Sequence, residues 1–270
     1  MELVRKITDK EIVQFCRATC DYNEIHDPAF MNMAGKRVIV PGMLLFCTIF
    51  GKHYAESNAK PDSIRILFNS VVHEGESIQL ITEECPDDPN CAYISALNGR
   101  DSFRYKDDRS RLYIRSSAPT IFGQGWIYNI NFSQDQLKNF QEVVQIHDND
   151  LANILFSVAY ASRALLLSIE QPYDIFEEEI ANMLNKNGSE DPMSPIYQTL
   201  DIYLETSTLE LDKSEPLEFL LGYERETLNR TYIAHVQCSH KGKIIYHSSY
   251  KLSGIPDRMI MRMAHNLTIS

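Results

Sequence analysis

The sequence lacks the features of an exported or membrane-bound protein. Residues 1–6 include the charged Glu2, Arg5 and Lys6, and the apolar run of a signal peptide is lacking. No window approaches about eighteen consecutive apolar residues, the length that a membrane-spanning helix needs. We therefore expect a soluble protein of the cytoplasm that has no membrane partner.

The cysteines lack the spacing of a disulfide framework or a zinc site. None of them forms a Cys-x-x-Cys pair, so all are expected to be reduced thiols. The grouping of His235, Cys238 and His240 resembles a set of metal ligands. In a strand, however, His235 would lie on one face and the other two residues on the opposite face. We therefore expect no metal ion and no redox cofactor.

Basic residues are outnumbered in this chain. The sequence has 26 lysines and arginines against 37 aspartates and glutamates, which gives a formal charge of -11. This charge, and the absence of a basic stripe interleaved with aromatic side chains, argue against nucleic acid as a partner. An anionic ligand would have to meet a local group of basic side chains. With 270 residues, 44% of them hydrophobic, the chain can bury one large core or two medium ones.

The two halves of the sequence repeat the same order of elements. Thr8 and Glu11 form a capping box at the start of a helix, and Ser133 with Gln136 forms a second one 125 positions later. Each capped helix is followed by a helix that is apolar almost all round and then by strands. The predicted apolar helices cover 42–55 and 151–169, and the predicted strands cover 63–72, 77–83, 91–97, 111–116, 197–209, 217–224, 231–239 and 243–252.

This pattern predicts an α+β fold. In each half, a long central helix should be wrapped by an antiparallel sheet. We expect one unit over residues 1–120 and a second over residues 121–270, with a polar surface insertion near residues 172–195. Lys241 and Gly242 predict a hairpin turn between the last two strands.

An acid and an imidazole lie in the loop between the two helices of the first half. Asp21 and His26 could hold a water molecule and exchange protons with it. Gly42, at the start of the apolar helix, could direct its N–H group and the positive helix end at a carbonyl oxygen. Pro41 suits such a helix start. The second half has only residues 144–150 in place of this loop, so the first half is predicted to be catalytic and the second structural.

The same residues resemble the signature of the MaoC-like hot-dog family, the (R)-specific enoyl-CoA hydratases and 3-hydroxyacyl-thioester dehydratases. That signature is Asp-x-Asn-Pro-x-His, followed by His-Gly-Met-Leu and a serine on the helix. Residues 21–28 read Asp-Tyr-Asn-Glu-Ile-His-Asp-Pro, and residues 39–44 read Ile-Val-Pro-Gly-Met-Leu. The resemblance implies a double hot-dog fold. The roles that it implies are a catalytic pair for Asp21 and His26, oxyanion donation for Gly42 and orientation for Asn23.

Three positions depart from the family signature. Glu24 stands where proline is usual, Pro41 where a histidine precedes the glycine, and Cys47 where a hydroxyl side chain is common. These departures keep the acid, the imidazole and the glycine N–H, although Pro41 removes a polar group close to the oxyanion site. Pro41, Met43 and Cys47 are candidates to line the substrate site.

The implied activity is that of a hydratase or dehydratase of fatty acid metabolism. It would interconvert the 2-enoyl and (R)-3-hydroxyacyl thioesters of CoA or acyl carrier protein, and the fold would allow a homodimer. Lys36 and Arg37 are candidates to contact a phosphate of the substrate, with solvated loop charges as the alternative. Two other functions stay open: a hot-dog thioesterase that uses a carboxylate and the same helix start, and a non-catalytic acyl-thioester-binding subunit.

Overall fold

One antiparallel sheet of ten strands runs through both halves of the chain. The computed structural model describes residues 3–56, 63–68, 71–85, 88–98, 110–114, 126–170, 193–225 and 231–256. The strands are β1 (Leu3–Lys6), β2 (Ser63–Leu67), β3 (Ser77–Cys85), β4 (Asp88–Asn98), β5 (Ser110–Ile114), β6 (Trp126–Ile130), β7 (Met193–Leu204), β8 (Leu217–Arg225), β9 (Thr231–His240) and β10 (Lys243–Pro256). Their order is β1-β3-β4-β5-β2-β7-β10-β9-β8-β6, so each half of the sequence supplies one side of the sheet.

The two sides of the sheet join through β2 and β7. These strands pair antiparallel, with Ile64 opposite Ile202, and both side chains are buried. On the other face, Arg65 forms an ion pair with Asp201, with Nη2 3.0 Å from Oδ2. The junction therefore alternates between buried apolar and exposed charged pairs, as a continuous sheet does. Both halves contribute to one hydrophobic core.

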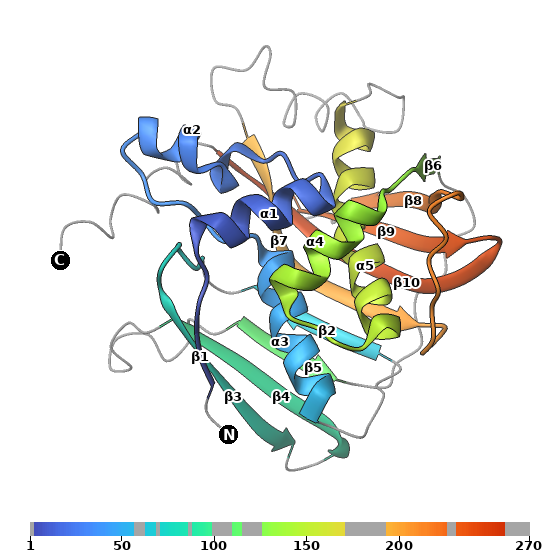
Figure 1. The fold of residues 1–270 in the computed structure, drawn as a ribbon, viewed down its shortest axis with the longest axis horizontal. Helices are drawn as coiled ribbons and strands as arrows, with labels where there is room; N and C mark the ends of the chain where they lie inside the picture. The colour runs from blue at the N-terminus through green and yellow to red at the C-terminus, as the bar shows by residue number, and fades with distance from the viewer. Residues whose placement is uncertain are drawn as a thin grey trace.

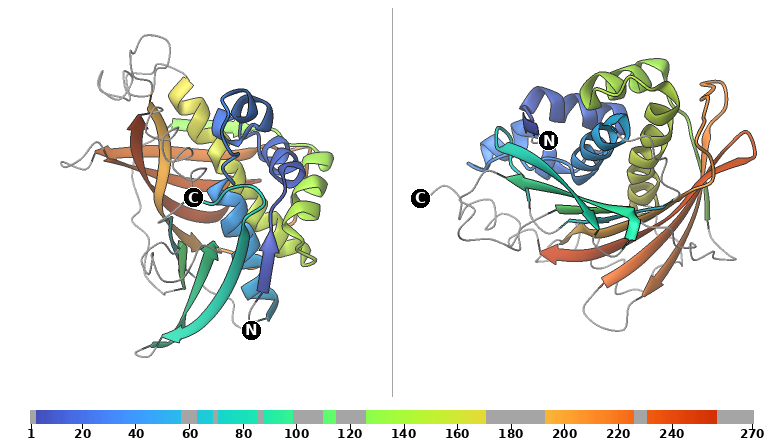
Figure 2. Two further views of the ribbon diagram at one scale, coloured as in Figure 1. Left: turned by 90° about the vertical axis from the view of Figure 1, so that its left-hand side faces the viewer. Right: turned by 90° about the horizontal axis from the view of Figure 1, so that it is seen from below.

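The described helices lie on the concave face of this sheet (Figure 2). They are α1 (Asp9–Thr19), the 3-10 helix η1 (Glu24–His26), α2 (Pro28–Met33), α3 (Gly42–Glu56), α4 (Gln134–Val144) and α5 (Asn149–Glu170). The long helices α3 and α5 pack against each other, and α1 packs against α4 (Figure 1). Each long helix is therefore covered by the sheet on one side and by a capped helix on the other.

The repeat predicted from the two capping boxes is confirmed. Both boxes are formed, and the C-caps Cys20 and Gln145 both have a left-handed backbone, with φ of 55° and 58°. The rings of Phe15 and Phe140 have their centroids 5.8 Å apart. These two residues occupy equivalent positions of the repeat, and a contact between equivalent positions is what a two-fold axis produces. The capped helices are therefore related by a pseudo-two-fold axis.

Most of the predicted helices and strands are confirmed, and the differences are two missed strands and shifted element ends. The sequence pattern does not predict β1 and β6, the outermost strands, because a short strand paired on one side needs little periodic apolar pattern. β2 ends at Leu67 and β7 at Leu204, earlier than predicted. The expected unit boundary near residue 120 and most of the expected insertion lie outside the described residues.

The hairpin predicted at Lys241 and Gly242 is confirmed. Both residues have positive φ, 51° and 72°, and β9 pairs with β10 across the turn. On β9, Cys238 is buried in the core. His240 accepts the N–H of Asp212 at Nε2, and its Nδ1 lies 3.2 Å from a backbone carbonyl oxygen. Both ring nitrogens of His240 therefore take part in the packing of the second half.

One helix among the described residues is long enough and apolar enough on average for a membrane span, although it holds no run of eighteen consecutive apolar residues. It is α5, over residues 149–168. In the structure, 83% of this apolar window is buried. Its apolar surface is covered by the sheet and by α1, α3 and α4, as expected of a helix in the core of a globular protein.

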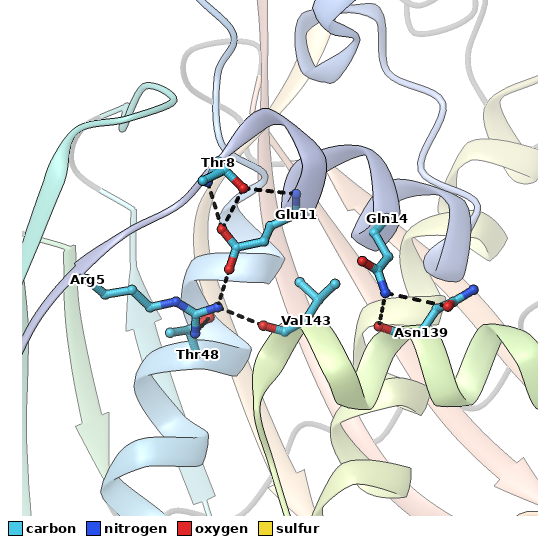
Figure 3. A network of polar contacts seen from close by, with 7 residues as sticks. All are labelled: Arg5, Thr8, Glu11, Gln14, Thr48, Asn139 and Val143. Atoms are coloured by element: carbon cyan, nitrogen blue, oxygen red, sulfur yellow. Dashed lines mark hydrogen bonds and ion pairs between the residues drawn. The ribbon is translucent and has the colours of Figure 1, made fainter.

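Arg5 connects four elements beneath the capped helices (Figure 3). Its guanidinium donates to Glu11 Oε1 at 3.0 Å, to the carbonyl oxygen of Val143 at 2.7 Å and to Thr48 Oγ1 at 3.3 Å. Val143 lies in the last turn of α4, where carbonyl groups have no partner within the helix. Burial alone would raise the pKa of Glu11, but hydrogen bonds from Thr8 and Arg5 lower it. The cap of α1 and the end of α4 are thus held by one cation.

We predict that Glu11→Gln lowers the free energy of unfolding by about 1 kcal/mol at neutral pH, because glutamine keeps the capping box and loses the ion pair with Arg5. The pKa of Glu11 is lower in the folded protein than its unperturbed value of 4.5. The stability difference between wild type and Glu11→Gln should therefore be fully present above pH 4.5 and should be lost as the pH falls through the lowered pKa. Urea titrations at pH 7 and pH 3 test this. Glu142→Gln, at an exposed ion pair, is the control, and an equal loss at both pH values would contradict the prediction.

Phe140→Ala should destabilise the protein by about 3–5 kcal/mol, because it removes a fully buried ring from the contact with Phe15. The exposed substitution Lys138→Ala, on the same helix, should change stability by less than about 0.5 kcal/mol. Urea denaturation followed by circular dichroism measures both. A single transition is expected, since both halves share the core; two separate transitions would contradict the shared core.

Candidate functional site

The loop from Cys20 to Pro41 is ordered by local hydrogen bonds. After the left-handed C-cap, the N–H of Asp21 donates to the carbonyl oxygen of Cys16 at 3.0 Å. Asn23 begins η1, where its Oδ1 accepts the N–H of Ile25 at 3.4 Å. Asp27 begins α2 in the same way, through the N–H of Ala29. Asn23, predicted to orient the site, therefore shapes the turn that carries His26.

The structure brings the predicted acid and imidazole together. His26 Nε2 lies 4.0 Å from Asp21 Oδ2, and the two side chains are only 10% and 12% exposed. This distance is too long for a direct hydrogen bond. The 4.0 Å separation allows both groups to contact one small molecule, such as a water, at a site that is largely shielded from solvent.

A backbone bond fixes the tautomer of His26. Its Nδ1 lies 2.6 Å from the carbonyl oxygen of Ile39. A carbonyl oxygen can only accept, so Nδ1 carries a proton and donates it. In the neutral ring, Nε2 then presents a lone pair on the side of Asp21. The imidazole is thus prepared to accept a proton from a group that lies beside the carboxylate.

The segment that holds His26 also leads into α3. The N–H of Ile39 donates to the carbonyl oxygen of Ile25 at 3.1 Å, and the N–H of Val40 donates to that of Val72 at 2.8 Å. Pro41 follows and is buried, and α3 begins at Gly42. Only two residues therefore separate the carbonyl group that holds the imidazole from the helix start.

Gly42 is tightly covered. A Cβ at this position would lie 3.1 Å from Phe68 Cε1, so a larger residue would push against the ring. The N–H groups of the first helical turn have no partner within the helix and carry its positive end. Phe68 is itself held by β7, because its N–H donates to the carbonyl oxygen of Gln198 at 2.9 Å. An oxyanion accepted at Gly42 would sit beside an apolar wall.

Met43 and Cys47, two further candidates on α3, are buried in the core, at 1% and 0% exposure. The thiol of Cys47 lies 3.9 Å from the carbonyl oxygen of Leu155 on α5, and burial raises its pKa. In this position the thiol stays protonated and contacts α5. Its contact with a substrate remains a prediction.

The two predicted phosphate contacts differ in their surroundings. Arg37 Nη1 donates to Glu76 Oε1 at 3.1 Å, and Nη2 donates to the carbonyl oxygen of Glu74 at 2.7 Å. Its charge is therefore balanced within the protein. The backbone N–H of Lys36 donates to the carbonyl oxygen of Met31 at 2.9 Å. Both assignments remain predictions, and Arg37 would have to exchange a carboxylate for a phosphate.

Helix α5 of the second half borders the same loop. The hydroxyl of Tyr160 lies 3.7 Å from Cys20 Sγ. The guanidinium carbon of Arg163 lies 5.7 Å from the centroid of the Tyr22 ring, within the range of a cation–π contact. Cys20 and Tyr22 flank Asp21 on both sides. The second half therefore supports the segment that carries the acid.

Tyr197 of β7 also reaches the site from the second half. Burial raises the pKa of its phenol, and the negative charge of Asp21 raises it further. The hydrogen bond with Ser162 lowers this pKa, but by less than burial raises it. The ring of Tyr197 lies 6.2 Å from that of Phe68, which covers Gly42. The sequence analysis missed these residues and Arg163, because no local motif marks a contact made across the two halves.

The start of α5 differs from that of α3. Asp148 caps it by accepting the N–H of Leu151 at 3.0 Å. Asp150 accepts the N–H of Leu209 at 2.9 Å, and Asn153 donates to the Leu209 carbonyl oxygen at 2.7 Å. An acidic side chain and the backbone of Leu209 therefore lie at the start of α5, whereas Pro41 and Gly42 lie at the start of α3.

Comparisons with known proteins identify the fold. A bifunctional dehydratase-cyclase domain in ambruticin biosynthesis superposes with a TM-score of 0.59 at 10% identity, covering 98% of this chain and 94% of that one. A MaoC-like dehydratase gives 0.53 at 10% identity, covering 94% and 97%. A MaoC domain dehydratase from Chloroflexus aurantiacus J-10-fl gives 0.53 at 10% identity, covering 93% of each chain. No protein-family model and no curated protein sequence matches the chain.

These likenesses confirm the predicted fold class. The chain has the α+β hot-dog fold of the MaoC-like dehydratases, over nearly the whole length of two of them. At this identity the comparison establishes the fold alone. The activity has to be argued from the side chains of the site.

We predict that His26 is protonated at Nδ1 and not at Nε2 when its ring is neutral, because Ile39 offers only an acceptor. Long-range ¹H–¹⁵N spectra of the histidine rings distinguish the two tautomers. The exposed His147 serves as the unconstrained reference within the same protein. A His26 ring protonated at Nε2 would contradict the prediction.

Proposed function

We propose that this protein is a MaoC-like hydratase or dehydratase that interconverts 2-enoyl and (R)-3-hydroxyacyl thioesters. The observation that carries the proposal is the pairing of Asp21 with His26 at 4.0 Å, in side chains that are barely exposed. A carboxylate and an imidazole with a free Nε2 are the groups that move protons to and from water near neutral pH. The proposal is completed by Gly42, at the start of a helix that follows the same loop.

In the hydration direction, water is held between Asp21 Oδ2 and His26 Nε2. Nε2 takes one proton of the water, and the remaining hydroxide forms a bond with the β-carbon of the enoyl thioester. Asp21 accepts a hydrogen bond from the second O–H of the water, and its negative charge stabilises the imidazolium. The imidazolium then returns its proton to the α-carbon, so one water is added and both residues regain their starting state. Dehydration follows the same steps in reverse.

The thioester carbonyl explains the need for Gly42. As the hydroxide adds, negative charge moves through the α-carbon to the carbonyl oxygen, which becomes enolate-like. The N–H of Gly42 and the positive end of α3 would stabilise this charge in a site from which water is largely excluded. Pro41 cannot add a second N–H there. The oxyanion would therefore depend on one backbone donor in this segment unless another residue contributes.

The substrate would be a thioester of CoA or of acyl carrier protein. Both carry phosphate, and a chain with a formal charge of -11 must meet it with local cations. Lys36, Arg37 and Arg163 are the candidates near the loop, and Arg163 is the one that contacts Tyr22 beside the acid. Formation of a homodimer and a location in the cytoplasm belong to the same proposal.

We predict that the purified protein consumes crotonyl-CoA or a longer 2-enoyl-CoA, followed as loss of the conjugated double bond in the ultraviolet. Asp21→Asn and His26→Ala should each lower kcat by about 100-fold or more, because each removes a proton-transfer group. Chiral analysis of the product should give the (R)-3-hydroxyacyl form.

Two matched controls keep this test specific. Asp27→Asn changes a neighbouring acid but keeps the cap of α2, and His147→Ala removes an exposed histidine; both should leave kcat within about twofold of wild type. Hydration that survives both Asp21→Asn and His26→Ala would refute the assignment. Release of free thiol without hydration would favour a thioesterase, and binding without turnover would favour a non-catalytic subunit.

A further inference from the structure

Ser162 on α5 differs from the other buried serines of that helix. Ser157 and Ser168 donate their hydroxyl protons to carbonyl oxygens of the helix itself, Ile154 at 2.7 Å and Leu165 at 2.6 Å. Ser162 is 3% exposed and accepts a hydrogen bond from the hydroxyl of Tyr197 at 3.1 Å. Within the described ranges, its own proton has no acceptor.

Tyr197 also differs from the neighbouring tyrosines of the sheet. Tyr246 and Tyr250 are fully buried and donate to carbonyl oxygens of α5, those of Ser157 at 3.0 Å and Val158 at 3.3 Å. These two bonds fasten β10 to the helix. The phenol of Tyr197 is buried as well, but it donates to a side-chain hydroxyl, and a hydroxyl that accepts this bond becomes a stronger donor to a further group.

The surroundings place this pair of hydroxyls beside the proposed site. The ring centroids of Tyr197 and Phe68 lie 6.2 Å apart, and Phe68 covers Gly42. The negative charge of Asp21 also contributes to the raised pKa of the Tyr197 phenol. The ring of Tyr197 thus lies against the residue that covers the start of α3, and its hydroxyl donates to Ser162.

We propose that Ser162 donates its free hydroxyl proton to the thioester carbonyl oxygen, as a second oxyanion donor alongside the Gly42 N–H. The inference rests on the proposed function. Ser162 is then a catalytic residue contributed by the second half, and Tyr197 is a positioning residue that orients and polarises the Ser162 hydroxyl. No proton is transferred in this step: the Ser162 O–H bond stays intact while its hydrogen bond to the carbonyl oxygen shortens as negative charge develops there.

The test compares Ser162→Ala with Ser157→Ala, and Tyr197→Phe with Tyr250→Phe, on a thioester that the wild-type protein turns over. Ser162→Ala should lower kcat by about 10- to 100-fold with little change in KM, because the donor acts mainly on the charged transition state. Tyr197→Phe should lower kcat by less, and should add nothing in the Ser162→Ala background. Ser162→Thr, which keeps a hydroxyl, should recover part of the rate.

The two controls remove a buried hydroxyl from the same helix, at Ser157, and from the tyrosine whose ring packs against Tyr197, at Tyr250. They should leave kcat within about twofold, and thermal unfolding of every variant identifies losses that come from folding. Turnover by Ser162→Ala that equals wild type, or a loss no greater than that of Ser157→Ala, overturns the inference alone. If Ser162→Ala does not fold, Tyr197→Phe is the deciding variant. A kcat equal to that of wild type in Tyr197→Phe would then overturn the roles proposed for both Ser162 and Tyr197. A wild-type protein without hydration activity overturns the proposed function and this inference with it.

Discussion

The geometry of the candidate site depends on the backbone of Ile39. Its carbonyl oxygen accepts the proton of His26 Nδ1, and its N–H donates to Ile25, so one peptide segment fixes both the ring and the loop that carries it. The next residue pairs with Val72, which ties this segment to the part of the chain before β3. A long loop that is folded against the core must satisfy its polar backbone groups, and here those bonds also set the tautomer of the imidazole. Packing and chemistry are therefore controlled by the same few hydrogen bonds.

The two halves share one sheet and one core but do not contribute equally to the site. The first half supplies Asp21, His26 and the start of α3. The second half contributes through the middle of α5 and through β7, which contact the loop and the ring over Gly42 by side chains that belong to no recognisable motif. Closing the sheet through β2 and β7 is what brings these elements together. The site is thus a product of the pairing of two units and not of either unit alone.

Much of this arrangement could be predicted from the sequence, because it depends on local patterns. The capping boxes, the apolar helices and the acid-imidazole loop are all read from spacing within a few residues. The edge strands β1 and β6 were not readable, since they need little apolar periodicity. Contacts between distant residues were also not readable: the ion pair of Arg37 with Glu76 and the hydrogen bond of Tyr197 to Ser162 join positions that no local pattern relates.

The cover over the start of α5 has a consequence for ligand saturation. Leu209 is hydrogen-bonded to both Asp150 and Asn153, so the helix start that a symmetrical pair of units would offer twice is offered once among the described residues. A carboxylate at that position also opposes a second anion. Under the proposed function, the described residues of each chain offer one such site, and the binding curve should be hyperbolic. Any sigmoidal response to substrate would have to come from coupling between separate chains.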